Sequence, residues 1–184
     1  MSLPNIVIFV LVFLILWLIF IFNSLVRRRN RVNEAWADID VQLKRRHDLI
    51  PNLMETVKGY MQHERGVLEN VTRARAEAVN AQTPQERQQK ENILSDTLKT
   101  LFAVSENYPD LKASANFLDL QRELADAENK IMAARRFYNT NVRDYNTATQ
   151  SFPINLVAGL FKFKERQLFE VQIEQEREVP KVSF

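Results

Sequence analysis

The hydrophobic residues of this chain form two patterns, a continuous block near its beginning and a periodic stripe in the rest. The block runs without a polar residue from Ile6 to Phe22, and no charge lies between Leu3 and Val26. A helix over these uncharged residues would be roughly 36 Å long, enough to cross a hydrocarbon core of about 30 Å. The preceding residues lack the basic charge of a signal peptide, and no small-residue cleavage site follows. The block therefore predicts an uncleaved transmembrane anchor over residues 1–26.

Four arginines come directly after this block and decide the predicted topology: Arg27, Arg28, Arg29 and Arg31. By the positive-inside rule they stay in the cytoplasm, which places the short N-terminus outside and residues 27–184 in the cytoplasm. A basic run is also typical of nucleic-acid-binding patches, but this one adjoins the lipid. We expect the lipid bilayer, and no nucleic acid, as its partner.

The periodic stripe begins after the arginines. From Val32, alternating steps of four and three residues meet apolar or aromatic side chains at eleven of thirteen positions up to Ala78, which predicts a helix over about 30–80. Thr83 and Pro84 form a start signal for a second helix over about 84–106. Further helices are predicted over about 116–149, where nine of ten stripe positions are apolar or aromatic, and over about 155–177.

Together these elements predict an all-α protein. The expected architecture is an N-terminal transmembrane helix followed by one domain, residues 27–184, built as an up-and-down antiparallel bundle of three to four long helices with coiled-coil-like packing. In this order the helix over 30–80 leads away from the membrane, 84–106 returns, 116–149 leads away again and 155–177 returns.

Composition argues against an enzyme. The 25 basic and 23 acidic residues are mixed along the soluble part, cysteine is absent, and three glycines cannot form a phosphate-binding loop. His47 and His63 are predicted to be surface residues too far apart to share a metal ion, and Asp48 does not face its neighbour His47 on a helix. We expect no catalytic residue, cofactor, metal site or small-molecule substrate.

Polar residues at stripe positions are the more informative candidates: Arg46, Glu64 and Asn141. A buried charge is costly unless it is paired, and its best-attested benefit is to fix register or partner choice. Arg46 could pair with Glu123 or Glu128 of the helix over 116–149. Alternatively, Arg46 and Glu64 lie at the edges of the stripe and extend to water.

Three more residues are candidates for a structural or interaction role. Pro51 lacks a backbone donor and crowds the carbonyl of His47, so we expect a kink or break there, with Gly59 as a second weak point. Trp36 and Phe161 could form an exposed apolar strip for a partner. The alternating Phe and Lys residues from Phe161 suit either bundle packing, which we favour, or the lipid interface.

Long stretches of the chain resemble the LemA family of bacterial membrane proteins, including "RNRVNEAWADIDVQLKRRHDLIPNLMETVKGYMQHE", "FPINLVAGLFKFKERQLFE" and "REVPKVSF". The resemblance implies a single-pass anchor in the bacterial inner membrane, a cytoplasmic helical bundle and no established reaction. Family members look like parts of envelope-associated assemblies. We therefore expect a non-enzymatic scaffold that forms a homo-oligomer on the membrane. The alternative is an adaptor that presents a bundle groove to a membrane protease, chaperone or other envelope protein.

Overall fold

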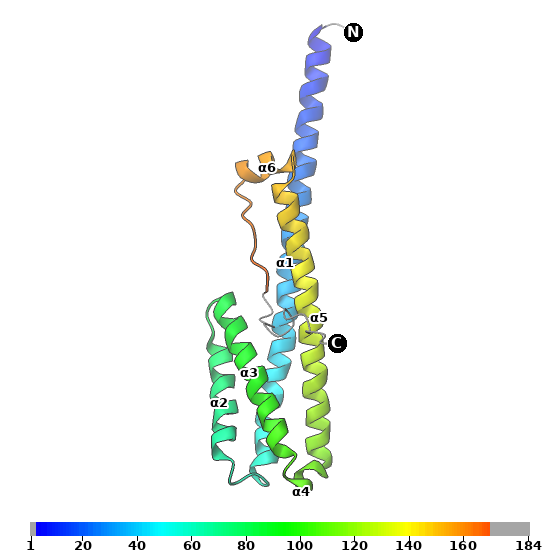
Figure 1. Ribbon diagram of the computed structural model, residues 1–184. Coiled ribbons are helices and arrows are strands. Elements are labelled where there is room, and N and C mark those ends of the chain that lie inside the picture. The colour runs from blue at the N-terminus through cyan, green and yellow to red at the C-terminus, as the bar shows by residue number, and fades with distance from the viewer. Residues whose placement is uncertain (1–2, 170–184) are drawn as a thin grey trace, which may run out of the picture.

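The computed structural model describes residues 3–169, and this part of the chain is all-helical, as predicted (Figure 1). The final third of the helix expected over 155–177 lies outside the described residues. The six helices are α1 (Leu3–Lys58), α2 (Arg65–Asn80), α3 (Pro84–Ser105), α4 (Pro109–Lys112), α5 (Ala115–Gln150) and α6 (Ile154–Leu160).

Two long antiparallel helices, α1 and α5, form the spine of the molecule (Figure 1). The hairpin of α2 and α3 covers only the half of this spine that lies away from the N-terminus, and α6 packs beside α1 near the other end. The apolar beginning of α1 projects beyond all other helices. Among the helices of residues 3–169, α1 alone is long and apolar enough to cross a membrane, which suggests a single-pass membrane anchor.

The predicted stripes form the core. Buried residues of α1 recur at steps of three and four from Val32 to Val57, and buried residues of α5 do so from Leu124 to Ala148. Such stripes face each other because three to four residues make one helical turn. They enclose three apolar clusters along the molecule, one where α2 and α3 cover the spine, one in its middle, and one beside α6.

The helix predicted over 30–80 is wrong in one respect, because the chain reverses at residues 59–64 between α1 and α2. Gly59 weakens the helix by about 1 kcal/mol relative to Ala. Met61 in the turn is fully buried in the same apolar cluster as Val57 and Val71. The reversal lets the second half of the stripe pack against α3, whereas a continuous helix would leave that half without a partner.

Because of this reversal, the later helices run in other directions than predicted. α2 runs back toward the N-terminal end, α3 leads away and α5 returns, so the helices over 84–106 and 116–149 each run opposite to the prediction (Figure 1). The bundle prediction is therefore confirmed only in part.

The helix predicted over 155–177 is also wrong within the described residues, because α6 ends at Leu160. Lys162 adopts a left-handed conformation with φ 56°. The backbone amides of Lys162 and Phe163 donate to the carbonyls of Gly159 and Ala158, which is the Schellman pattern that ends many helices. Residues 163–169, called the return segment below, then run without helical structure back along the spine (Figure 1).

Pro51 does not break α1, which continues without interruption to Lys58. A proline leaves the carbonyl four residues earlier without its helical donor, and here that is the carbonyl of His47. The Arg75 side chain of α2 supplies the missing donor, with its Nε 2.8 Å from that oxygen. Pro51 thus creates an acceptor on the surface of α1 that α2 uses.

This arrangement predicts an energetic coupling between Pro51 and Arg75. Replacing Arg75→Met should cost about 1–2 kcal/mol of unfolding free energy, because it leaves the His47 carbonyl unpaired. In a Pro51→Ala background the restored backbone amide takes this carbonyl, so the same replacement should cost about 1 kcal/mol less. Denaturant unfolding of the four proteins measures the difference. Arg73→Met is the control, since Arg73 donates to Asn70 of its own helix at 2.6 Å. Equal costs of Arg75→Met in both backgrounds would contradict the coupling.

Candidate functional site

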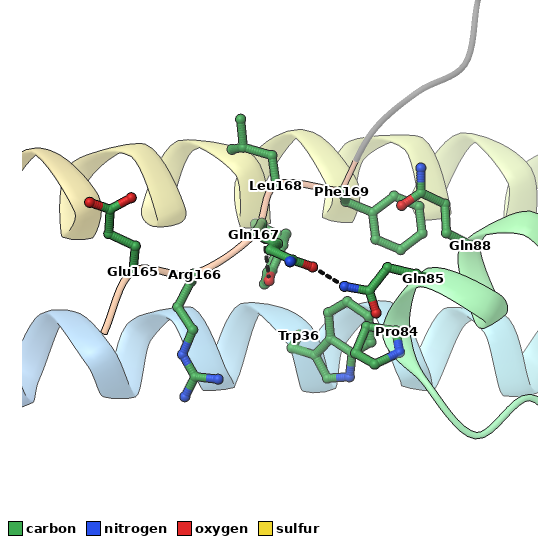
Figure 2. A pocket seen from close by; sticks show the side chains of 10 residues that line it. Trp36, Pro84, Gln85, Gln88, Glu165, Arg166, Gln167, Leu168 and Phe169 are labelled. Atoms are coloured by element: carbon green, nitrogen blue, oxygen red, sulfur yellow. Dashed lines mark hydrogen bonds between the residues drawn. The ribbon is translucent and has the colours of Figure 1, made fainter. Parts of the chain in front are cut away.

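The return segment lies in a groove between α1 and α5, next to the beginning of α3 (Figure 2). A hollow of about 280 Å³ opens beside its last residues. Gln85 at the start of α3 reaches the side chain of Gln167 in the segment (Figure 2). The groove is therefore bounded by three helices and occupied by an extended stretch of the same chain.

Two asparagines of α5 each bind both polar groups of one backbone residue of the segment. Asn139 accepts from the amide of Phe169 at 2.7 Å and donates to its carbonyl at 2.9 Å. Asn146 does the same with Arg166, at 2.9 Å and 2.8 Å. A side-chain amide can do this because it carries one acceptor and one donor side by side. Both contacts recognise main chain, and neither depends on the side chains of the segment.

Two tyrosines, each directly before one of these asparagines, add further main-chain contacts. The hydroxyl of Tyr138 donates to the carbonyl of Gln167, and that of Tyr145 donates to the carbonyl of Lys164, both at 3.0 Å. Burial raises the pKa of both phenols above the ordinary value, so the hydroxyls remain protonated and act as donors. We call these four residues the α5 ladder: Tyr138, Asn139, Tyr145 and Asn146.

The spacing of the ladder matches that of an extended chain. Its two Tyr-Asn pairs are seven residues apart, which is about 10.5 Å along a helix. The residues they bind are three apart, from Lys164 to Gln167 and from Arg166 to Phe169, which is about 10 Å in an extended chain. Two turns of helix therefore stay in register with three residues of the segment.

Phe169 anchors the end of the described segment. Its side chain is 2% exposed, with its ring 5.9 Å from that of Trp36. The guanidinium of Arg135 lies over the ring of Phe169 at 4.5 Å, a cation–π contact. A buried aromatic anchor surrounded by main-chain hydrogen bonds is an arrangement typical of a peptide-binding site.

Farther along α1 than Trp36, the side chain of Arg46 connects α1, α3 and α5 inside the bundle. Its guanidinium lies 2.5 Å from a carboxylate oxygen of Glu128 on α5, and on α3 it donates to Ser95 at 2.7 Å and pairs with Glu91. The side chains of Arg46 and Glu91 are 1% and 0% exposed. The predicted pairing of Arg46 with Glu128 is therefore present, whereas Glu123 takes no part among these contacts.

His47 completes a cluster of polar side chains formed by Arg46, Glu91, Ser95 and Glu128. The predicted surface position of His47 is therefore wrong. Its Nε2 lies 2.9 Å from Oε1 of Glu91, and its side chain is 13% exposed because α3 covers it. Burial alone would raise the pKa of Glu91, but the contact with His47 and the charge of Arg46 outweigh burial and hold this pKa below its usual value. Glu91 is therefore an ionised carboxylate in the centre of the bundle.

The lowered pKa of Glu91 predicts how stability depends on pH. When folding lowers the pKa of a carboxyl group, its ionised form stabilises the folded state. This stabilisation is complete above the pKa of the group in the unfolded chain, about 4.3, and is lost as the pH falls through the pKa in the folded protein. The neutral variant Glu91→Gln should be less stable than the wild type at pH 7. This difference should shrink below about pH 4. Urea unfolding of both proteins between pH 7 and pH 3 measures it, and a difference independent of pH would contradict the assignment.

Arg135 links the buried cluster to the groove. Burial lowers the pKa of its guanidinium, and the nearby charge of Arg46 acts in the same direction, against Glu128 and Glu91. Its Nη1 lies 3.4 Å from Asn92, while its Nε and Nη2 have no hydrogen-bond partner within residues 3–169. The ring of Phe169 covers this guanidinium, so the return segment closes over a cation that the bundle itself leaves incompletely paired.

The other predicted candidates lie apart from the cluster. Glu64 precedes α2 and accepts a hydrogen bond from Tyr108 at 3.0 Å. Asn141 donates to the carbonyl of Phe137 in its own helix, and Val142 takes the core position predicted for it. Phe161 packs on Phe22, with 4.9 Å between the rings.

Two further predicted sets can be placed in the structure. Trp36 lines the groove, and its ring lies 5.3 Å from that of Tyr138. The four arginines after the apolar block, Arg27, Arg28, Arg29 and Arg31, are exposed. Their role in membrane topology stays a prediction.

The α5 ladder and Glu91 were missed by sequence reasoning. The Tyr-Asn dipeptide occurs twice with seven-residue spacing, at 138 and 145, and this repeat is the signal that could have revealed the ladder. Glu91 gave no comparable signal because an isolated glutamate in a helical stretch is usually solvated. Within residues 3–169 the structure has no group of three His, Asp or Glu side chains placed to hold a metal ion.

Comparison with known proteins confirms the resemblance to the LemA family. The profile of the LemA family matches residues 35–184. Protein LemA of Metamycoplasma hominis is 29% identical over 164 residues, which cover 87% of this chain and 71% of that protein. Magnetosome protein MamQ of Magnetospirillum gryphiswaldense is 22% identical over 174 residues, covering 80% of this chain and 64% of that protein. Neither LemA nor MamQ is known as an enzyme family.

Proposed function

Because the chain belongs to the LemA family, we propose that it is a non-enzymatic, single-pass membrane-anchored scaffold whose copies self-associate into a membrane-bound assembly. In this proposal α1 crosses the bacterial inner membrane with its short N-terminus outside, and the helical bundle lies in the cytoplasm. The arginines from Arg27 to Arg31 support this orientation by the positive-inside rule.

The observation that carries the proposal is main-chain recognition by the α5 ladder. Asn139 and Asn146 bind backbone amides and carbonyls, so the ladder accepts an extended segment from any copy of the chain. A neighbouring copy in the same membrane offers an identical return segment at the same height. Tethering in a thin layer raises the effective concentration of that segment, so weak contacts suffice to connect copies.

The joint before the segment supports exchange between copies. Lys162 has a positive φ, a conformation that costs a residue other than glycine roughly 1 kcal/mol. A change of backbone direction here would redirect the segment while α6 stays on its own α1. Exchange of an identical element between copies is a low-cost route to association.

A second candidate function is favoured by the same geometry. An extended segment of another envelope protein, such as a membrane protease or chaperone, could occupy the groove, and the chain would then act as an adaptor. Phe169 suggests that such a segment needs a large aromatic residue, because it fills the space between Trp36 and Arg135.

Self-association is tested by measuring the mass of particles extracted from membranes with the surrounding lipid. The scaffold proposal predicts particles containing several copies of the chain at native expression levels. Particles with one copy and no companion would contradict both proposals, and one copy with another protein would favour the adaptor.

A further inference from the structure

Several large apolar side chains in and beside α6 are exposed on the surface of the protein. Four of them are prominent: Phe152, Leu156, Leu160 and Phe161 are 80%, 64%, 70% and 45% exposed. They belong to one short stretch of 10 residues, from 152 to 161. Contiguous apolar surface of this kind marks a protein or membrane contact.

The position of α6 along α1 identifies which contact it is. α6 packs through Val157 and Ala158 in the same cluster as Ile21 and Leu25 of α1. The ring of Phe161 lies against Phe22, the last residue of the unbroken apolar block. α6 therefore lies at the height where α1 changes from an apolar helix to one that carries four arginines (Figure 1).

Basic residues accompany the apolar ones at this height. Lys162 and Lys164 follow α6 directly and are exposed. Arg29 lies over the ring of Phe163 at 5.4 Å. Apolar side chains beside lysines with long stems are typical of protein surfaces at the boundary between lipid tails and headgroups, because the stems can reach outward to the phosphates.

We propose that α6 is a second membrane contact, which lies in the headgroup region of the bilayer that α1 crosses and inserts Phe152, Leu156 and Leu160 into it. The occupant is lipid because α1 already brings the bilayer to this height. Self-association is not required for this contact. Its consequence is mechanical: a lone transmembrane helix can rotate about its axis, whereas two contacts fix the direction in which the groove faces.

Site-directed spin labelling of the full-length chain in bilayers tests this proposal directly. The chain has no cysteine, so Leu156→Cys, Leu160→Cys and Phe137→Cys each give one labelled site. Phe137 is the matched control, because it is 55% exposed on α5 and lies about 20 Å along that helix from its membrane-proximal end. Collision rates are measured with oxygen, which concentrates in lipid, and with a water-soluble nickel chelate.

Labels at 156 and 160 should show a ratio of oxygen to nickel accessibility several-fold higher than the label at 137. Equal ratios at all three sites would place α6 in water and overturn the proposal. Labels at 156 and 160 that neither reagent reaches would also overturn it, because another protein surface would then cover α6.

Discussion

Replacing Arg46→Met should be among the most destabilising single changes in this protein, at about 3–5 kcal/mol, because it leaves the buried carboxylate of Glu91 without its main cation. For a chain of this size, such a loss lowers the melting temperature by about 6–20 °C. Circular dichroism of the detergent-solubilised protein during heating measures this change.

The neighbouring residue provides the matched control. Arg45 pairs with Asp126 at 3.0 Å, but these side chains are 40% and 44% exposed, so Arg45→Met should cost at most about 1 kcal/mol. Arg46→Met/Glu91→Met should recover much of the loss, because it removes the unpaired buried charge. Equal effects of the Arg45 and Arg46 variants would contradict the role of the buried cluster.

Removing the two ladder asparagines should release the return segment from the groove. Asn139→Ala/Asn146→Ala deletes four hydrogen bonds to main chain, worth at least about 0.5 kcal/mol each. A loss of about 2 kcal/mol raises the open population about 30-fold. Limited trypsin digestion reports it, since cleavage after Lys164 and Arg166 should accelerate by this factor when opening is fast relative to cleavage.

Asn141→Ala is the matched control for this experiment. Asn141 lies on the same helix between the two ladder asparagines, and its amide binds a carbonyl of α5 itself. Its removal should leave the cleavage rate at these two sites unchanged. If the double variant also cleaved at the wild-type rate, the ladder would not be what holds the segment.

Local pattern was sufficient to predict the helical class and most core positions. The apolar block depends only on composition and the stripes from Val32 and Phe117 only on helical periodicity, and the structure buries most positions of both stripes. The predicted core positions were wrong where periodicity could not decide between a step of three and a step of four residues. After Ile131 the core takes Arg135, where a step of three had selected Ala134, and after Tyr138 it takes Val142 and not Asn141. For this reason sequence reasoning missed one buried arginine.

Features set by contacts between distant residues could not be predicted in this way. The reversal at Gly59 leaves the stripe periodic on both sides, so periodicity cannot distinguish one long helix from two antiparallel ones. Phe161 and Leu168 keep a helical spacing of seven residues, but side chains of α5 bind the backbone of the return segment about 20–30 residues away in sequence. Glu91 likewise becomes a buried partner of Arg46 only because α3 packs on α1.

Three parts of the molecule belong together. α1 suggests an anchor, the cluster around Arg46 ties α1, α3 and α5 together, and α5 presents a ladder for extended main chain. A bundle with a groove that recognises backbone is suited to the proposed role of connecting polypeptides at a membrane.

The most direct test of segment exchange is crosslinking between copies that carry different tags. Gln150 on α5 donates to Glu165 of the segment at 2.8 Å, so Gln150→Cys in one copy and Glu165→Cys in the other place a cysteine on each side of the contact. A short bismaleimide added to membranes containing both copies should yield a product with both tags, well above that from a control pair of Arg122→Cys and Glu165→Cys. Crosslinking found only within a single chain that carries both cysteines, at 150 and 165, would contradict exchange and assign the segment to its own groove.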